Sequence, residues 1–444
     1  MNTNKVQIST LPPHIESVLR RIEEKGYQAF LVGGCVRDTV MSRPVHDWDV
    51  ATSATPEDIA LIFRKTFLTG AKYGTVTVVL PEESVEVTSF RIDGEYRDGR
   101  RPENVELGAK LEEDLKRRDF TMNAMAMSSN GELIDAFGGL DDIQNRTIRC
   151  VGIPDARFGE DALRMFRAFR FSAELGFAVE PVTLSAIFSN ADRAQLISAE
   201  RVQVELEKTL MSQKPEIAVD MINAGLLNDK FGIRNSEFGI SMKRGSGSAV
   251  QSAGYGEDTL ASIIARVVNL PAQPTLRWCA FCAALLEKGQ IRSCASFLRG
   301  LRLDSKTVKS CSVGITIALC AKEPGNRGDR TGNVEFQISE RQQIKRLLAK
   351  YGADAVRCAV AAADSGGQSL AVVDGIIAGG ECFSLRELTV TGHDLIALGY
   401  QPGPEIKRIL NELLDYVIEH PGDNAREILL ETAKQRVNPE FGNP

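Results

Sequence analysis

Short strand-like runs alternate with helical patterns in the first 150 residues. Apolar and β-branched residues predict strands at residues 29–32, 75–80 and 85–90. A Gly-Gly pair follows the first run, and a Pro-Glu-Glu-Ser turn separates the other two. Strands that alternate with helices in this way predict a mixed α/β unit.

After about Val151 the pattern becomes helical, because apolar residues recur at steps of three and four. The predicted helices cover residues 159–175, 199–211, 276–286, 341–363 and 403–419. Two stretches rich in Gly, Ser or charged residues, 234–257 and 322–335, are typical of linkers or mobile loops. The whole pattern predicts an α+β protein, with a compact α/β head and a mostly helical remainder.

Composition narrows the class of protein. The 444 residues include 53 Lys and Arg against 59 Asp and Glu, a formal net charge of −6, which excludes a generally basic nucleic-acid coat. The sequence has no run of about 18 apolar residues and no apolar signal region at its start, so we expect neither a membrane span nor a secretory signal. Nine scattered Cys indicate reduced thiols. We expect a cytoplasmic, multidomain chain.

A glycine turn and two acids form the first candidate site. Gly33 and Gly34 permit a tight turn that a phosphate can approach, and a helix from about Val36 would present its N–H groups to an anion, with Arg37 beside them. An ordinary strand–helix turn has the same sequence pattern, so this pair alone does not establish a phosphate site.

An Asp-x-Asp pair follows the glycine turn. In extended backbone, Asp47 and Asp49 would project to the same face and repel each other unless a cation lies beside them. Oxygen ligands in a chain with only four His favour Mg²⁺. Glu86, on an otherwise apolar strand, is either a third carboxylate of this site or an edge-strand charge. Asp-x-Asp also occurs in surface turns.

Arginines mark the next two motifs. Arg117 and Arg118 run into Asp119-Phe120-Thr121, where Asp119 or Thr121 is predicted to cap an apolar helix over residues 122–127. Further on, Asp161 and Arg164 are three residues apart and would pair on one face of a helix. Guanidinium groups buried along that helix would need anions or other acceptors nearby, because burying an unpaired charge is costly. The arginines of this stripe are Arg164, Arg167 and Arg170.

An acid beside an arginine offers one acceptor and several donors. Cytosine and adenine edges match that pattern, whereas guanine and uracil would leave polar groups unpaired. The Asp161–Arg164 pair therefore suggests that side chains select C and A, although a solvated surface salt bridge has the same spacing. Cys279 and Cys282, on an apolar helical run with no second Cys pair, are interpreted as core packing and not as a zinc site.

The motifs occur in an order and spacing that resemble class II tRNA nucleotidyltransferases and poly(A) polymerases. The resemblance rests on Gly33-Gly34-x-x-Arg37-Asp38, Asp47-x-Asp49, Arg117 to Thr121, Glu160-Asp161-x-x-Arg164 and Glu200-Arg201-Val202. It is specific over residues 29–211 and loose over 223–380. Residues 390–395 and 399–406 resemble the tail of bacterial CCA-adding enzymes.

The resemblance implies a seahorse-like arrangement and a site. It implies a catalytic head (residues 1–150), a neck with a nucleotide-selecting helix (151–215), a body (216–335) and a tRNA-binding tail (336–444). It implies Mg²⁺ on Asp47 and Asp49, with Asp161 and Arg164 reading the base. The implied nucleotide contacts are Gly34, Arg37, Arg118, Asp161, Arg164, Arg167 and Arg170. Residues 93–102 resemble the flexible loop of CCA- and A-adding enzymes, or form an exposed turn.

The expected activity is template-independent addition of CCA to a tRNA 3′ end from CTP and ATP. The terminal ribose hydroxyl would attack the α-phosphate in line and expel pyrophosphate, with two Mg²⁺ positioned by Asp47, Asp49 and, as a further candidate, Glu86. The alternatives are an A-adding enzyme, a poly(A) polymerase, a metal-dependent phosphohydrolase, or a non-catalytic RNA-binding module. No protein partner is implied.

Overall fold

The computed structural model describes residues 3–5, 11–94, 104–234, 259–322, 341–363 and 368–437. The chain divides into two compact units, Met1–Gly254 and Tyr255–Pro444. All the described strands belong to the first unit, and the second is helical, which confirms the α+β prediction. The finer division into four domains stays a prediction. Most of the predicted loops at 93–102, 234–257 and 322–335 lies outside the described residues.

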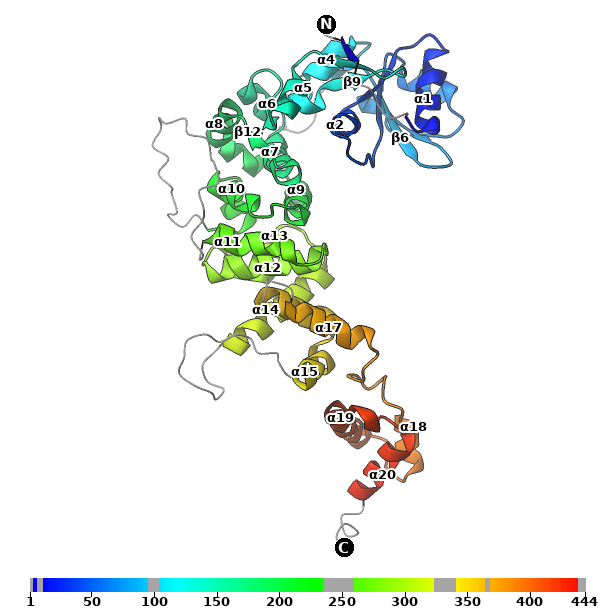
Figure 1. Ribbon diagram of the computed structural model, residues 1–444, viewed down its shortest axis with the longest axis vertical. Helices are drawn as coiled ribbons and strands as arrows, with labels where there is room; N and C mark the ends of the chain where they lie inside the picture. The colour runs from blue at the N-terminus through cyan, green and yellow to red at the C-terminus, as the bar shows by residue number, and fades with distance from the viewer. Residues whose placement is uncertain are drawn as a thin grey trace. The chain divides into compact units, whose positions relative to one another are not determined.

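An eight-stranded mixed sheet forms the head (Figure 1). Its order is β1-β10-β9-β2-β3-β6-β5-β4, and β3 with β6 is its parallel pair, the other pairs being antiparallel. The strands are β1 (Thr3–Lys5), β2 (Ala29–Val32), β3 (Asp49–Thr52), β4 (Thr66–Gly70), β5 (Thr75–Val79), β6 (Ser84–Ser89), β9 (Met125–Met127) and β10 (Glu132–Asp135). The strands predicted at 29–32, 75–80 and 85–90 are β2, β5 and β6.

Each face of the sheet has its own apolar core. On one face, Val50 of β3 and Val85 and Val87 of β6 pack with α1 (Pro13–Glu23) and α3 (Pro56–Ile62). On the other face, Ala51 of β3 packs with Leu115 of α4 (Leu111–Lys116). Because side chains alternate along a strand, Asp49 and Glu86 point to the same side of the sheet as α4.

The remaining short elements of the first unit flank the sheet or follow it. The hairpin strands β7 (Arg91–Asp93) and β8 (Val105–Leu107) pair with each other, and β11 (Thr147–Ile148) pairs in parallel with β12 (Ala178–Val179). The helices are α2 (Gly34–Val40), α5 (Gly139–Gln144), α6 (Pro154–Glu160), α7 (Leu163–Leu175), α8 (Pro181–Asn190), α9 (Ala199–Met211) and α10 (Ile217–Asn223). The helix predicted over 199–211 is α9, with the same bounds.

Two predictions in this unit are wrong. Residues 122–127 are not a helix: a 3₁₀ turn at Thr121–Asn123 leads into β9, because the apolar run fills the buried centre of the sheet. The helix predicted over 159–175 is two helices, α6 and α7, separated at Asp161, whose backbone is extended at φ −143° and ψ 103°. The break takes the Asp161 side chain out of helical register with Arg164.

The second unit consists of helices. These are α11 (Leu260–Ala265), α12 (Pro274–Glu287), α13 (Cys294–Gly300), α14 (Ser305–Lys322), α15 (Arg341–Tyr351), α16 (Ala353–Ala363), α17 (Gln368–Ala378), α18 (Gly392–Ala397), α19 (Pro404–Glu419) and α20 (Arg426–Val437). The helices α12, α15, α16 and α19 cover the segments predicted at 276–286, 341–363 and 403–419. The helix predicted over 341–363 is divided into α15 and α16 at Gly352, where φ is +80°. Among the described helices, none has the length and apolar character needed to cross a bilayer.

Candidate active site

Three carboxylates gather at the start of β3 and on β6. Asp49 is the first residue of β3 and is partly buried, whereas Asp47 lies exposed in the preceding loop and not in a strand. Glu86 of β6 is the register partner of Asp49 across the parallel pair, which places both side chains on one face. The structure thus brings together the three acids predicted from the sequence.

The electrostatics of Asp49 reflect this crowding. Burial raises the pKa of the Asp49 carboxyl from 3.8 to about 6, the nearby Arg118 guanidinium opposes that rise, and the carboxylates of Glu86 and Asp47 add to it. A carboxyl that holds its proton this tightly lacks enough positive charge around it. Binding of a divalent cation would supply that charge.

The glycine turn lies against the same acids. Gly33 has φ +78°, and a Cβ atom there would lie 3.0 Å from Nη1 of Arg118 and 3.6 Å from Oδ2 of Asp49. A side chain at this position would therefore both strain the backbone and fill the space between these two groups. Helix α2 begins directly afterwards at Gly34, two residues before the predicted start.

Arg118 is poised beside the acids with spare donor capacity. Its Nη2 donates to Oδ2 of the fully buried Asp114 at 3.1 Å. Its Nε is buried and has no hydrogen-bond acceptor within the described structure. A buried guanidinium donor without an acceptor is costly, and it suits an anion arriving next to Asp49.

Arg37 is buried and held on two sides. Its Nε and Nη2 donate to the two oxygens of Asp38 at 3.0 and 2.9 Å, and its Nη1 donates to Oδ1 of Asn123 at 2.9 Å. Its guanidinium also lies 5.1 Å from the centre of the Phe171 ring on α7. Arg37 thus joins α2 to the segment that follows α4.

The predicted ion pair between Asp161 and Arg164 is wrong. Oδ2 of Asp161 accepts from Nη2 of Arg201 on α9 at 2.7 Å, and its Oδ1 accepts from the backbone N–H of Leu163. Arg164 donates instead to Glu160 at 2.6 Å and to the carbonyl oxygens of Arg157 and Arg117. The break between α6 and α7 causes this exchange of partners.

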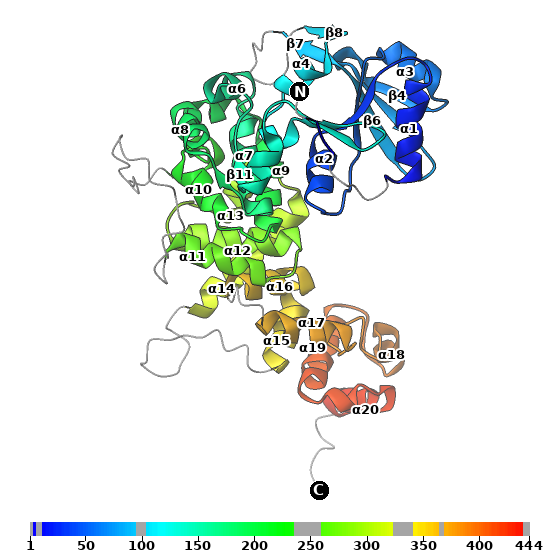
Figure 2. The ribbon, with the colours of Figure 1, turned by 45° about the horizontal axis from the view of Figure 1, so that its top comes forward.

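Each arginine of the stripe along α7 forms an ion pair with a carboxylate of the protein. Arg167 meets Asp119 at 2.7 Å, and Arg170 meets Glu205 of α9 at 2.6 Å and Glu174 at 2.8 Å. Figure 2 shows α7 running beside α9, which supplies Glu205 and Arg201. The anions that buried guanidinium groups require are therefore present in the protein itself.

The segment that follows α4 connects the acids to α7. Asp119 accepts from Arg167 through Oδ2 and from Asn123 through Oδ1, and Asn123 in turn accepts from Arg37. Next to it, Arg118 faces Asp49 while the carbonyl of Arg117 accepts from Arg164. Asp119 and Thr121 therefore hold tertiary contacts and do not cap a helix, since Thr121 donates to Asp142.

Asp119→Asn is expected to lower the free energy of unfolding by about 2–3 kcal/mol at neutral pH, because Arg167 loses its carboxylate while its side chain is only 35% exposed. Although burial opposes the shift, Arg167 and Asn123 lower the pKa of Asp119 to about 2. The wild-type contribution is therefore present above pH 4 and is lost as the pH falls through 2.

Urea unfolding between pH 2 and 7 measures this effect. Between pH 4 and 2 the Asp119→Asn protein should lose less stability than wild type, while Glu381 and Asp394, whose pKa values are also lowered to about 2, contribute equally to both proteins. The control is Glu82→Gln, in the exposed turn between β5 and β6, which should follow wild type. Equal pH curves for wild type and Asp119→Asn would contradict the proposed ion pair.

Four supporting residues were not predicted from the sequence as site residues. They are Asp114, Asn123, Glu160 and Arg201. Helical spacing would have indicated two of them, since Asp114 precedes Arg118 by four residues and Glu160 precedes Arg164 by four. Asn123 and Arg201 act across the tertiary structure, and spacing does not show their contacts, although Arg201 stands in one of the motifs that carry the resemblance.

Comparisons with known proteins agree with this geometry. Family models match the poly A polymerase head domain over residues 29–149, the RNA and SrmB binding site of polymerase A over 176–230, and tRNA nucleotidyltransferase domain 2 over 273–433. A CCA-adding enzyme of Limosilactobacillus fermentum is 37% identical over 440 residues, covering 96% of this chain and 98% of its own. One of Enterococcus faecalis is 33% identical, covering 97% and 98%.

A solved structure matches over nearly the whole chain as well. The crystal structure of the Bacillus stearothermophilus CCA-adding enzyme in complex with CTP has a TM-score of 0.73 and 32% sequence identity, and the match covers 96% of this chain and 98% of that one. Near-complete coverage at more than 30% identity shows the family. This chain therefore belongs to the class II nucleotidyltransferases, among the bacterial CCA-adding enzymes.

Proposed function

We propose that this chain adds C, C and A to the 3′ end of tRNA, using CTP and ATP and no nucleic-acid template. The observation that carries the proposal is the cluster of Asp47, Asp49 and Glu86 beside Arg118, joined through residues 117–119 to helix α7. The relatives named as CCA-adding enzymes, and the one solved with CTP, support the same activity.

The carboxylate cluster fits Mg²⁺. Its donors are hard oxygen atoms, and the raised pKa of Asp49 shows a shortage of positive charge at that point. Asp47 and Asp49 would hold the ions, with Glu86 as a third ligand. When bound, two Mg²⁺ ions would lower the pKa of the attacking ribose hydroxyl and stabilise the charge on the departing pyrophosphate.

The protein's own groups would orient the nucleotide. Gly33 and Gly34 leave the backbone open to a phosphate, and Arg118 offers its unpartnered Nε next to Asp49. Arg37 would contribute by exchanging its bond to Asp38 for a phosphate oxygen. Held in this way, the α-phosphate would face the terminal ribose hydroxyl of the acceptor for in-line attack.

The break between α6 and α7 and the first turn of α7 would present the base-reading groups. We propose that Asp161 accepts from the exocyclic amine of cytosine or adenine while Arg164 donates to the ring nitrogen. Arg201 holds Asp161 in place, and Glu160 holds Arg164. Arg167, with a side chain 35% exposed, is open to a further nucleotide contact. Arg170 would contact the nucleotide only by leaving Glu174, the more exposed of its two partners.

Stepwise incorporation tests the proposal. The purified protein would be incubated with three tRNAs, ending before C74, after C74 and after C75, and with each nucleoside triphosphate alone. We expect CTP to extend the first two acceptors and ATP only the third. Extension by ATP alone would identify an A-adding enzyme, and unlimited addition of A would identify a poly(A) polymerase. Phosphate release without extension would contradict the proposal.

A further inference from the structure

Three cysteine sulfurs meet in the core of the second unit. Cys279 of α12, Cys311 of α14 and Cys358 of α16 are all buried, and their Sγ atoms lie within 4.8 Å of one another. They are 32 and 47 residues apart along the chain, so only the packing of three helices brings them together.

Close helix packing keeps these sulfurs within reach. A Cβ atom at Gly314 of α14 would lie 2.4 Å from the Cβ of Cys358, so glycine is required for α14 and α16 to approach this closely. The Cys279 thiol donates to the carbonyl of Cys358 at 3.2 Å, and the Cys311 thiol donates to the carbonyl of Thr275 at 3.4 Å. The three side chains are thus held in place before any ligand arrives.

The spacing matches three sulfurs around one ion. Three bonds of about 2.3 Å to one centre place the sulfurs at most about 4.0 Å apart, and closer than that around a pyramidal centre, so side-chain rotations that bring the sulfurs together would close the site. Among the described residues the group has three ligand atoms and no fourth. A structural zinc ion takes four ligands, which argues against zinc.

Net charge narrows the choice of ion. Three thiolates with a monovalent or divalent cation would leave negative charge in an apolar core, which is costly. Three thiolates with a trivalent ion form a neutral complex. Soft thiolate ligands select soft, thiophilic ions. A trivalent thiophilic element that takes three ligands satisfies both conditions.

We propose that Cys279, Cys311 and Cys358 form a binding site for trivalent arsenic, taken up as neutral arsenous acid. Three As–O bonds break and three As–S bonds form, while the three thiol protons leave with the three hydroxyl groups as water. No atom changes oxidation state, so the step needs no oxidant or reductant.

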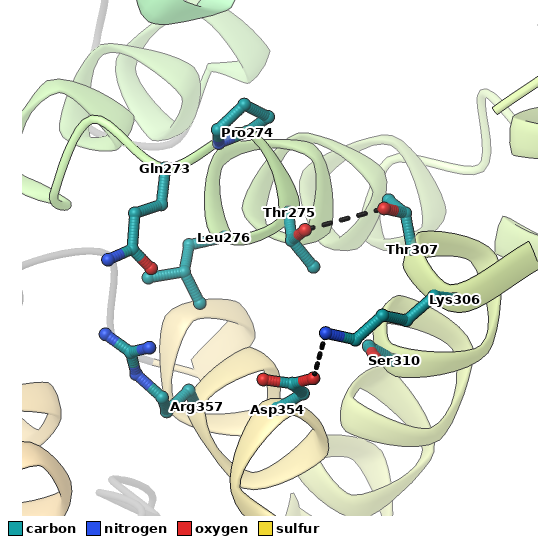
Figure 3. A pocket seen from close by; sticks show the side chains of 9 residues that line it. All are labelled: Gln273, Pro274, Thr275, Leu276, Lys306, Thr307, Ser310, Asp354 and Arg357. Atoms are coloured by element: carbon teal, nitrogen blue, oxygen red, sulfur yellow. Dashed lines mark hydrogen bonds and ion pairs between the residues drawn. The ribbon is translucent and has the colours of Figure 1, made fainter. Parts of the chain in front are cut away.

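A polar pocket lies next to the helices that carry the three cysteines, although the cysteines themselves do not line it (Figure 3). The same three helices wall it, and it contains Thr275, whose carbonyl is bonded to Cys311, as well as Ser310 and Arg357, the chain neighbours of Cys311 and Cys358. Lys306 and Asp354 form an ion pair of 3.0 Å at its side. A small neutral molecule with three hydroxyl groups suits such a lining.

The test uses the full-length reduced protein with sodium arsenite as the probe. After gel filtration, arsenic per chain is measured by mass spectrometry, and free thiols are counted in denaturant. We expect one arsenic per chain and the protection of three of the nine thiols. Binding of zinc or copper(I) at these thiols in place of arsenite would overturn the proposal.

Cysteine-to-alanine variants test which thiols bind arsenite. Cys279→Ala, Cys311→Ala and Cys358→Ala should each weaken arsenite binding roughly a hundredfold or more, because the chelate loses one of its three bonds. Cys320→Ala, at an exposed position on α14, and Cys294→Ala, at a buried cysteine beside Cys282, should bind like wild type. Thermal melting would confirm that each variant is folded. Full binding by a folded Cys311→Ala protein would overturn the proposal.

Discussion

Asp49→Asn is expected to abolish nucleotide addition and, at the same time, to stabilise the metal-free protein. The amide cannot replace a carboxylate as an anionic ligand of Mg²⁺, so we expect incorporation of CMP to fall by roughly a thousandfold or more. The substitution also removes a charge that the fold accommodates poorly. Since the pKa of Asp49 is raised from 3.8 to about 6, ionisation of this carboxyl costs stability above pH 6.

The stability that Asp49→Asn adds to the metal-free protein depends on pH. At pH 7.5, without metal, the free energy of unfolding of Asp49→Asn should exceed that of wild type by about 1–3 kcal/mol. The difference should shrink as the pH falls from about 6 toward 3.8, because Asp49 of the folded wild type is then protonated while that of the unfolded chain is still ionised. Urea unfolding in EDTA measures this, and primer extension with CTP measures the activity.

Glu57→Gln is the matched control for this experiment. It exchanges the same groups at an exposed position on α3 and should leave both activity and stability unchanged. A fully active Asp49→Asn enzyme would exclude the metal mechanism. An inactive but destabilised one would show that burial and the neighbouring acids do not penalise the Asp49 carboxylate as the structure indicates.

Asp161→Asn is expected to change which base is accepted while leaving the rate with correct primers within about tenfold. The amide offers a donor where the carboxylate offers only acceptors, so uracil and guanine gain a partner opposite their oxygen atoms. We expect the preference for CTP over UTP, and for ATP over GTP, to fall by roughly 10- to 100-fold, the value of one or two hydrogen bonds.

Competition assays with paired nucleotides measure this preference directly. Asp155→Asn, on the exposed surface of α6, provides the control and should keep wild-type selectivity. Because Asp161 is also bonded to Arg201, circular dichroism must show that the variant is folded. Unchanged selectivity in a folded Asp161→Asn enzyme would exclude this residue as the base reader.

The sequence predicted the chemistry of the site better than its contacts. The runs at β2, β5 and β6 are short, apolar and bounded by turns, so period and turn residues located them. Asp47 and Asp49 were predicted as a pair on the assumption of extended backbone, but Asp47 lies in the loop before β3. The meeting of Asp49 with Glu86 depends on the β3–β6 pairing, which only the fold provides.

The failures have physical causes as well. Helical periodicity continues through Asp161, so a pattern of apolar positions does not reveal the break at this residue. For the same reason it does not reveal that Asp161 pairs with Arg201 and not with Arg164. Residues 122–127 are apolar except for Asn123, and a short apolar run of this kind does not distinguish a buried helix from a buried strand. Cys279 and Cys282 are both fully buried, as predicted for core packing, but the meeting of Cys279 with Cys311 and Cys358 depends on helix packing, which spacing along the sequence does not show.

Because β3 pairs with β6, the register of β6 determines whether Glu86 lies beside Asp49. Deleting or inserting one residue within Ser84–Ser89 would turn Glu86 toward α1 and α3 and bring Val85 or Val87 to face Asp49. The turn before it can change length at lower cost at its exposed residues Pro81 and Glu82, since an altered loop leaves the strand in phase, whereas Glu83 contacts His14 at 2.6 Å. Natural or engineered length variation in this part of the chain should therefore concentrate in the turn and spare the strand.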